Sequence, residues 1–296
     1  MIHTKWFILA AGLALLTACS NDTGSSAEEN TEITEETASG TESQSEETAE
    51  QKEQEEKAAE EEAKEKAKEK AEEEAKAKAE EEAMLKPQYR VNPGNSVVEP
   101  IADANAEAVL ITIDDAPDKH AVEMAETLKQ LEVPAIFFVN GHFLDTDEEK
   151  ENLKKIHEMG FAIGNHTYNH SNLTTITEEE QREEIVQLSD TVEEIIGERP
   201  KFFRAPHGIN TDFSKSLVEE EGMVLMNWTY GYDWEQQYQD ADALTDIMVN
   251  TEFLNNGGNL LMHDREWTAE ALPGIIEGLS AKGYGFIDPQ EIEGGK

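Results

Sequence analysis

Short apolar runs and amphipathic segments alternate through residues 108–290. Runs rich in β-branched residues predict strands, and segments with apolar positions three or four residues apart predict helices. The predicted strands are Ala108–Asp114, Ala135–Asn140, Ala162–His166, Lys201–Ala205, Met223–Thr229, Asn259–His263 and Gly285–Asp288. The predicted helices lie near residues 119–131, 147–159, 178–196, 212–221, 242–255 and 268–282. This regular alternation predicts parallel strands joined by right-handed crossovers.

The number of predicted strands favours a barrel-like α/β domain over a two-layer sheet. We assign this domain to residues 87–296, because Pro87 ends the helical pattern that precedes it. In such barrels the active site lies at the C-terminal ends of the strands. The polar side chains at those ends are therefore the candidates for chemistry.

A different pattern opens the chain. One positive residue, Lys5, precedes a short apolar run that ends at Leu16, and small residues follow up to Cys19. The run is too short to span a bilayer comfortably, so residues 1–18 are predicted to be a secretory signal peptide. Residues 16–19, Leu-Thr-Ala-Cys, resemble a bacterial lipobox, which implies a lipid-modified Cys19. An ordinary signal peptide with an incidental cysteine is the alternative. We expect a protein lipid-anchored at the extracellular face of the cell membrane.

Residues 19–86 lack the apolar positions of a folded core. Residues 19–50 consist largely of Ser, Thr, Glu and Gly, which predicts a disordered acidic linker. Residues 51–86 are rich in Ala, Glu and Lys, with Glu–Lys pairs four residues apart, and predict a solvent-exposed helical spacer. Because no leucine or isoleucine heptad runs through it, a coiled-coil dimer is the weaker interpretation, and a monomer is expected.

The composition narrows the function classes. The chain carries 65 Asp and Glu against 24 Lys and Arg, a formal net charge of −41. A protein that binds a nucleic-acid duplex needs a basic surface, so nucleic acid is not an expected partner. Cys19 is the only cysteine, which makes an intrachain disulfide impossible.

Two adjacent carboxylates, Asp114 and Asp115, follow the first predicted strand. Because side chains alternate along a strand, the two acids cannot both continue one buried face, and their charges need compensation at the strand end. An acidic N-cap of the next helix is the alternative interpretation. We favour a functional site, because other strand ends supply histidines and an arginine.

His166 and His170 follow the third predicted strand four residues apart, a spacing that on a helical turn places both imidazoles on one face. With a carboxylate such as Asp115 they form a ligand set for a divalent metal ion. A histidine pair at this spacing is weak evidence by itself. The acid pair at another strand end of the same fold strengthens the metal-site interpretation.

Arg204 and His263 are the remaining unusual residues at strand ends. Arg204 follows the fourth strand among apolar neighbours, which favours pairing with a buried carboxylate over a place on the surface. His263 ends the sixth strand beside Asp264. A lone histidine is more often structural, but this position makes His263 a candidate general acid.

Taken in order, these segments resemble the polysaccharide deacetylases, the NodB-homology domain of carbohydrate esterase family 4, over roughly residues 105–290. The segments that carry the resemblance are Thr112–Asp115, His166–His170, Arg204–Gly208, Trp228–Trp234 and Leu260–His263. The resemblance implies a distorted (β/α) barrel. It also implies that Asp114 is the catalytic base, that Arg204 orients it, and that His263 is the general acid. It further implies a divalent metal ion, with Zn²⁺ expected, on Asp115, His166 and His170.

The sequence departs from this family's pattern at three places. His207 stands where an aromatic residue is usual, although the backbone beside it is still implied in binding the oxyanion. Ala116 stands where glycine is usual. The fourth motif usually has two acids, whereas here only Asp233 remains, before Trp234. Trp228 and Trp234 are expected either to wall a sugar pocket or to pack in the core.

The reduced fourth motif leaves two candidate partners for His263, namely Asp233 and Asp264. Adjacent residues on a strand point to opposite faces, which disfavours a contact between His263 and Asp264. Asp233 approaches from a neighbouring strand end, so we favour it.

The function that follows from the resemblance is metal-dependent removal of N-acetyl groups from amino-sugar polymers. An outward-facing lipoprotein suggests a peptidoglycan-type cell-wall glycan as its substrate. One alternative is an O-acetyl esterase that acts on a wall glycan, and another is a non-catalytic cell-envelope binding protein that retains the fold. The reduced fourth motif favours the non-catalytic alternative, whereas the base, the metal ligands and His263 argue against it.

Overall fold

The computed structural model describes residues 87–294 together with Lys66, Lys68 and Lys70, which are helical. The predicted signal peptide, the linker and nearly all of the predicted spacer lie outside the described residues. Within the described part of the chain, no helix combines the length and the hydrophobicity that crossing a membrane requires.

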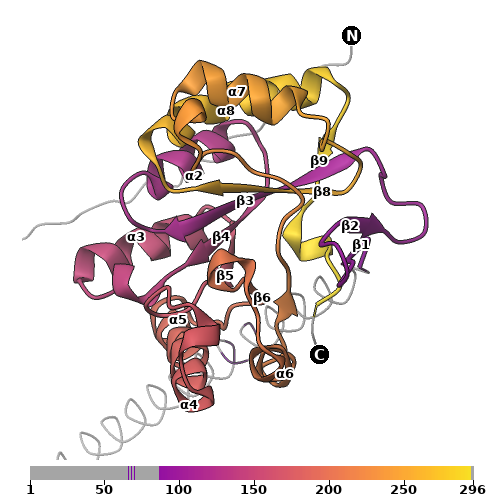
Figure 1. Ribbon diagram of the computed structural model, residues 1–296. Coiled ribbons are helices and arrows are strands. Elements are labelled where there is room, and N and C mark those ends of the chain that lie inside the picture. Colours follow the sequence, from indigo (N-terminus) through magenta and orange to yellow (C-terminus); the bar gives the residue numbers. More distant parts are fainter. Residues whose placement is uncertain (1–65, 67, 69, 71–86, 295–296) are drawn as a thin grey trace, which may run out of the picture. The chain divides into compact units, whose positions relative to one another are not determined.

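A curled sheet of seven parallel strands forms the centre of residues 87–294 (Figure 1). Its strands are β3 (Ala108–Ala116), β4 (Ala135–Val139), β5 (Ala162–Asn165), β6 (Phe202–Phe203), β7 (Val224–Leu225), β8 (Gly258–His263) and β9 (Gly285–Phe286). Their spatial order is β7-β6-β5-β4-β3-β8, and β9 pairs with the first residues of β3. A separate antiparallel pair is formed by β1 (Tyr89–Val91) and β2 (Val98–Pro100).

The segment that follows β7 links the two sides of the curled sheet. After β7 the chain crosses from β6 to β8, where Tyr230 forms a parallel bridge with Leu260. The predicted strand Met223–Thr229 is therefore wrong for most of its length, because a segment that crosses between two edges cannot stay paired with either. Strands β6 and β9 are likewise shorter than predicted, at two residues each. The predicted α/β class and distorted (β/α) barrel are confirmed.

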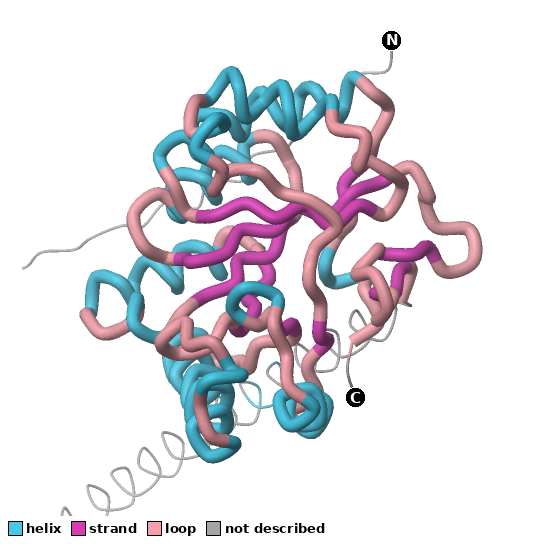
Figure 2. The backbone as a smooth tube through the Cα atoms, viewed as in Figure 1, coloured by secondary structure: helices cyan, strands magenta, loops and turns pink. Residues whose placement is uncertain are grey.

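Helices cover the outer face of the sheet (Figures 1 and 2). They are α2 (Ala121–Gln130), α3 (Asp147–Glu158), α4 (Glu178–Arg182), α5 (Leu188–Ile196), α6 (Asp212–Glu220), α7 (Ala241–Asn250) and α8 (Glu266–Ala281). The helix predicted over 178–196 is interrupted by a π-helical turn, Glu183–Gln187, between α4 and α5.

Alternation along β3 divides its side chains between two environments. Val109, Ile111 and Ile113 pack against the helices in the larger core. Leu110 faces the inside of the curl, where it packs with apolar side chains of β4, β6, β1 and β2. The same inner column continues as Thr112 and Asp114, so the interior of the barrel becomes polar toward the C-terminal strand ends. This change in polarity positions the site.

Candidate active site

Asp114 lies at the polar end of the inner column and is buried, with 2% of its surface exposed. Arg204, which is fully buried after β6, donates from Nη1 to Asp114 Oδ1 at 2.6 Å and to Thr112 Oγ1 at 2.8 Å. Its Nη2 donates to the Asn227 carbonyl at 2.9 Å and to Asn259 Oδ1 at 3.0 Å. Burial lowers the pKa of Arg204 against the opposing effect of Asp114, but a guanidinium remains charged. Arg204 therefore compensates the buried carboxylate.

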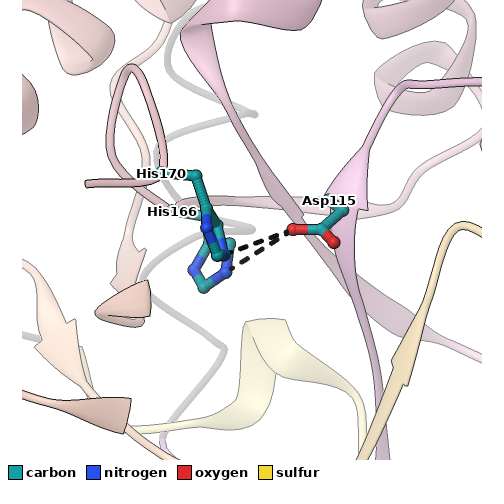
Figure 3. Close-up of side chains that lie close together, drawn as sticks. All are labelled: Asp115, His166 and His170. Carbon is teal, nitrogen blue, oxygen red and sulfur yellow. Dashed lines mark ion pairs between the residues drawn. The ribbon is translucent and has the colours of Figure 1, made fainter. Parts of the chain in front are cut away.

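Asp115 reaches the same site because β3 is irregular at its end. The register between β3 and β4 shifts between Ile113 and Ala116, and Asp115 has a φ of 60°. Such a bulge re-aims a side chain, so ideal strand alternation does not separate the two acids here. Asp115 Oδ1 lies 3.6 Å from His170 Nε2 and 3.9 Å from His166 Nε2 (Figure 3).

His166 and His170 do not lie on one helical turn, so that part of the prediction is wrong. Residues 166–170 are a loop after β5 in which Thr167 and His170 have φ of 68° and 57°. These left-handed residues turn the chain so that the two imidazole centroids lie 5.0 Å apart. His166 Nδ1 lies 2.7 Å from the Arg204 carbonyl, to which it donates because a carbonyl can only accept. The lone pair of His166 Nε2 is thereby left for the site.

The chemistry of Asp115, His166 and His170 fits a divalent metal ion. Their ligand atoms all lie within 4.8 Å of one another. The oxygen–nitrogen distances of 3.6 and 3.9 Å are close to the roughly 3.4 Å that separates tetrahedral ligands bound at about 2.1 Å. Burial lowers the pKa of both histidines, and together with the neighbouring His166 it lowers the pKa of His170 to about 4. Both imidazoles are therefore neutral at neutral pH, the form that binds a metal.

His263 stands on the other side of β3, at the end of β8, where it is the register partner of Asp114. Asp233, which is fully buried, accepts from His263 Nδ1 at 2.7 Å and from the His263 backbone N–H at 2.6 Å. The Thr268 hydroxyl also donates to Asp233, at 2.9 Å. Burial lowers the pKa of His263, but the hydrogen bond and charge of Asp233 outweigh it, and the pKa is raised. The pair thus favours an imidazolium.

Asp264, the other candidate partner of His263, makes different contacts. Its carboxylate is buried and accepts from the backbone N–H groups of Lys119 at 3.0 Å and His120 at 2.6 Å, immediately before α2. It therefore ties the loop after β3 to the end of β8.

Arg265 is a site residue that sequence reasoning missed. Its Nη2 donates to Asp115 Oδ2 at 2.8 Å, which leaves Oδ1 to face the two histidines. Burial alone would raise the pKa of Asp115, but His263, the other imidazoles and Arg265 together lower it. The only sequence signal was the position of Arg265 two residues after the general-acid candidate.

An open cleft of about 430 Å³ connects these groups, and it is lined by Asp114, Asp115, His166, His170, His207, Trp228, Asp233, Trp234, Leu261, His263 and Arg265. Trp228 and Trp234 wall it, with ring centroids 6.4 Å apart. Trp234 is 47% exposed, and its ring meets that of His263 edge-on at 5.6 Å. His207 has a φ of 59°, and its ring lies 5.0 Å from that of His170.

A metal-ligand set beside a buried carboxylate and a histidine–aspartate pair is an arrangement typical of metal-assisted hydrolysis. Residues 102–226 match the model of the polysaccharide deacetylase family, and the chain belongs to that family. Over 190 residues it is 30% identical to a peptidoglycan-N-acetylglucosamine deacetylase of Bacillus cereus, a match that covers 62% of this chain and 67% of that protein. The chain spans about two thirds of the length of the curated relatives it matches.

Solved structures with similar folds include both an enzyme and a pseudoenzyme. A peptidoglycan N-acetylglucosamine deacetylase is 29% identical with a TM-score of 0.57, over 62% of this chain and 87% of that chain. A pseudoenzyme of carbohydrate esterase family 4 from Bacillus anthracis is 27% identical with a TM-score of 0.57, over 63% of this chain and 65% of that chain. Membership of the family therefore does not by itself establish catalysis.

Proposed function

We propose that this chain is a metal-dependent hydrolase that removes N-acetyl groups from an amino-sugar polymer of the cell wall, with a peptidoglycan-type glycan as substrate. One observation carries the proposal: a single cleft joins the Asp115, His166 and His170 set to Asp114 and to the His263–Asp233 pair. The peptidoglycan deacetylases among the relatives support the substrate class.

Asp114 is the proposed base. A divalent ion on the Asp115, His166 and His170 set, proposed to be Zn²⁺, would polarise the acetyl carbonyl and lower the pKa of an attacking water. Arg204 occupies Oδ1 of Asp114, whereas Oδ2 lies 3.6 Å from His166 Nε2 and so faces the metal-ligand side. Oδ2 is therefore the oxygen that takes the proton of the water.

His263 is the proposed acid. Its Nδ1 is held by Asp233, so Nε2 is the nitrogen that delivers a proton to the leaving amine. Asp233 stabilises the imidazolium, which keeps the acid protonated at higher pH than an ordinary histidine. We propose that the backbone at His207 contributes to oxyanion binding and that Trp234 contacts the sugar.

The segments that precede residue 87 bear on where this activity takes place. We propose that Cys19 carries a lipid anchor at the outer face of the membrane and that residues 19–50 and 51–86 are a linker and a helical spacer that present the domain at residues 87–296. The lipobox-like sequence before Cys19 supports the anchor. Such an anchor would place the cleft within reach of the wall glycan.

Asparagine substitutions of the two adjacent carboxylates distinguish the proposed base, Asp114, from the proposed metal ligand, Asp115. Asp114→Asn should retain bound metal and lose acetate release by about 10²–10⁴-fold, because it removes a general base. Asp115→Asn, His166→Ala and His170→Ala should lose metal and activity together. Metal content is measured by elemental analysis and acetate by an enzymatic assay. The opposite pattern for the two carboxylates would reverse their roles. A wild type that binds metal and glycan but releases no acetate would instead indicate a non-catalytic envelope protein.

A further inference from the structure

The π-helical turn Glu183–Gln187 faces the loop that carries the two candidate metal ligands, here called the histidine loop (residues 166–171). Regular helix continues on both sides, in α4 and α5. A π turn inserts an extra residue into a helix, is rare, and is frequently found at functional sites. From outside the helix, this turn accepts hydrogen bonds from the end of β5 and from the histidine loop.

Two backbone carbonyls of the π turn accept hydrogen bonds from outside the helix. The Tyr168 N–H donates to the Glu184 carbonyl at 2.9 Å. The Asn165 side chain, at the end of β5, donates from Nδ2 to the Ile185 carbonyl at 2.8 Å. In a regular α-helix each carbonyl accepts from the N–H four residues later, whereas the wider π turn displaces those bonds. The turn thereby joins the start of the histidine loop to the helix.

The Glu184 side chain holds the rest of the loop. Glu184 is buried, with 7% of its surface exposed. Its carboxylate accepts from the Asn169 N–H at 2.7 Å, from Asn169 Nδ2 at 2.9 Å and from Ser171 Oγ at 2.9 Å. Within residues 87–294, all three hydrogen bonds accepted by this carboxylate come from the histidine loop. His170 lies between the two donor residues, so Glu184 fixes the chain on both sides of it.

His170 needs this support more than His166 does. The His166 ring is buried and is oriented by its own hydrogen bond to the Arg204 carbonyl. The His170 side chain is 30% exposed, and its backbone is left-handed. A non-glycine residue keeps that conformation only where surrounding contacts hold it.

We propose that Glu184, presented by the π turn, is a positioning residue for the metal site: it holds residues 169–171 so that His170 Nε2 faces Asp115. The inference rests on the proposed metal-dependent function. It goes beyond that function because it makes the metal affinity of the site depend on Glu184, a residue outside the cleft. Residues that orient a metal ligand without binding the metal themselves typically lower metal affinity about 10–100-fold when they are replaced.

The test compares Glu184→Gln with Glu183→Gln in the full chain. Glutamine keeps the size of Glu184 but places an NH₂ group against the Asn169 or Ser171 donors. The Zn²⁺ dissociation constant, measured by competition with a chromogenic chelator, should rise about 10-fold for Glu184→Gln. Glu183 is the exposed neighbour in the same turn, so Glu183→Gln should leave the constant unchanged. At saturating Zn²⁺ the kcat of Glu184→Gln should return to the wild-type value. A variant in which the fold of the whole site is disturbed would not show this recovery.

A milder variant keeps the test decisive if Glu184→Gln folds poorly. Ser171→Ala removes one of the three hydrogen bonds and should raise the dissociation constant about 3-fold. Its effect should be smaller in the Glu184→Gln background, because the two residues act through one contact.

Three results would overturn the inference. Equal Zn²⁺ affinity of the wild type and folded Glu184→Gln would overturn it and leave the proposed function standing. A kcat that saturating Zn²⁺ does not restore would also overturn it, since Glu184 would then support the fold of the site as a whole. A wild type that binds no Zn²⁺ would overturn both the inference and the proposed function.

Discussion

Replacing Arg204 by methionine should destabilise the fold strongly, because Asp114 would stay buried without its cation. Arg204 has no exposed surface, and its guanidinium donates four hydrogen bonds. Removing one partner of a buried ion pair typically costs about 3–5 kcal/mol of unfolding free energy. The Asn227 carbonyl and Asn259 Oδ1 would also each lose a donor, which places the expected loss toward the upper end of that range.

The assay is urea unfolding followed by tryptophan fluorescence, with linear extrapolation of the unfolding free energy. Arg199→Met is the control: Arg199 pairs with three acids, Asp190, Glu193 and Glu221, whereas Arg204 pairs with one, but the Arg199 side chain is 34% exposed. Solvent screens such pairs, so its loss should cost less than about 1 kcal/mol per pair.

A double variant distinguishes the destabilisation caused by the unpaired buried charge from that caused by lost packing. Arg204→Met combined with Asp114→Asn removes both charges, so it should be more stable than Arg204→Met alone by about 1–3 kcal/mol. Two outcomes would contradict this prediction. One is an Arg204→Met protein within about 1 kcal/mol of the wild type, and the other is a double variant no more stable than the single one.

Three further predictions concern pH and location. His263 must be protonated to act as an acid and Asp233 raises its pKa, so Asp233→Asn should move the basic limb of the kcat–pH profile to lower pH. Asp264→Asn should barely move that limb, and a limb that responds only to Asp264 would contradict the assignment. The pKa of His170 is about 4, so Zn²⁺ affinity should change little between about pH 7 and pH 5 and fall as pH approaches that value; a loss near pH 6.5 would argue against a neutral, buried ligand pair. Cys19→Ala should release the protein from the membrane fraction, and unchanged retention without lipid labelling would contradict the anchor.

The order of strands and helices could be predicted from the sequence because it depends on local periodicity. A continuous apolar run rich in β-branched residues predicts β3 with its polar end at Asp114, and the barrel follows from repeated strand–helix units. The length of β7 could not be predicted in this way. Residues 226–229 belong to the predicted strand, but their pairing is decided by the distance between two sheet edges, which is a tertiary property.

The site could be predicted by residue type but not by geometry. The structure brings the predicted base, metal ligands and histidine–aspartate pair into one cleft, and Arg204 lies buried against Asp114. The spacing of the histidines predicts a helical turn, whereas Thr167 and His170 are left-handed. The residues on both sides of His170 hydrogen-bond to a π turn that no local pattern indicates. Arg265 was missed for the same reason: its contact with Asp115 joins residues 150 positions apart.

The decisive experiment for the proposed metal-dependent N-deacetylase is acetate release from an N-acetylated peptidoglycan glycan, measured before and after removal of metal from the full chain. We predict that the wild type releases acetate and forms one free amine for each acetate, that chelation stops the release, and that Zn²⁺ restores it. Asp114→Asn reloaded with Zn²⁺ should release acetate about 10²–10⁴-fold more slowly than the wild type. Release that survives chelation, continues at the wild-type rate in Asp114→Asn, or comes only from O-acetylated glycan would contradict a metal-dependent N-deacetylase.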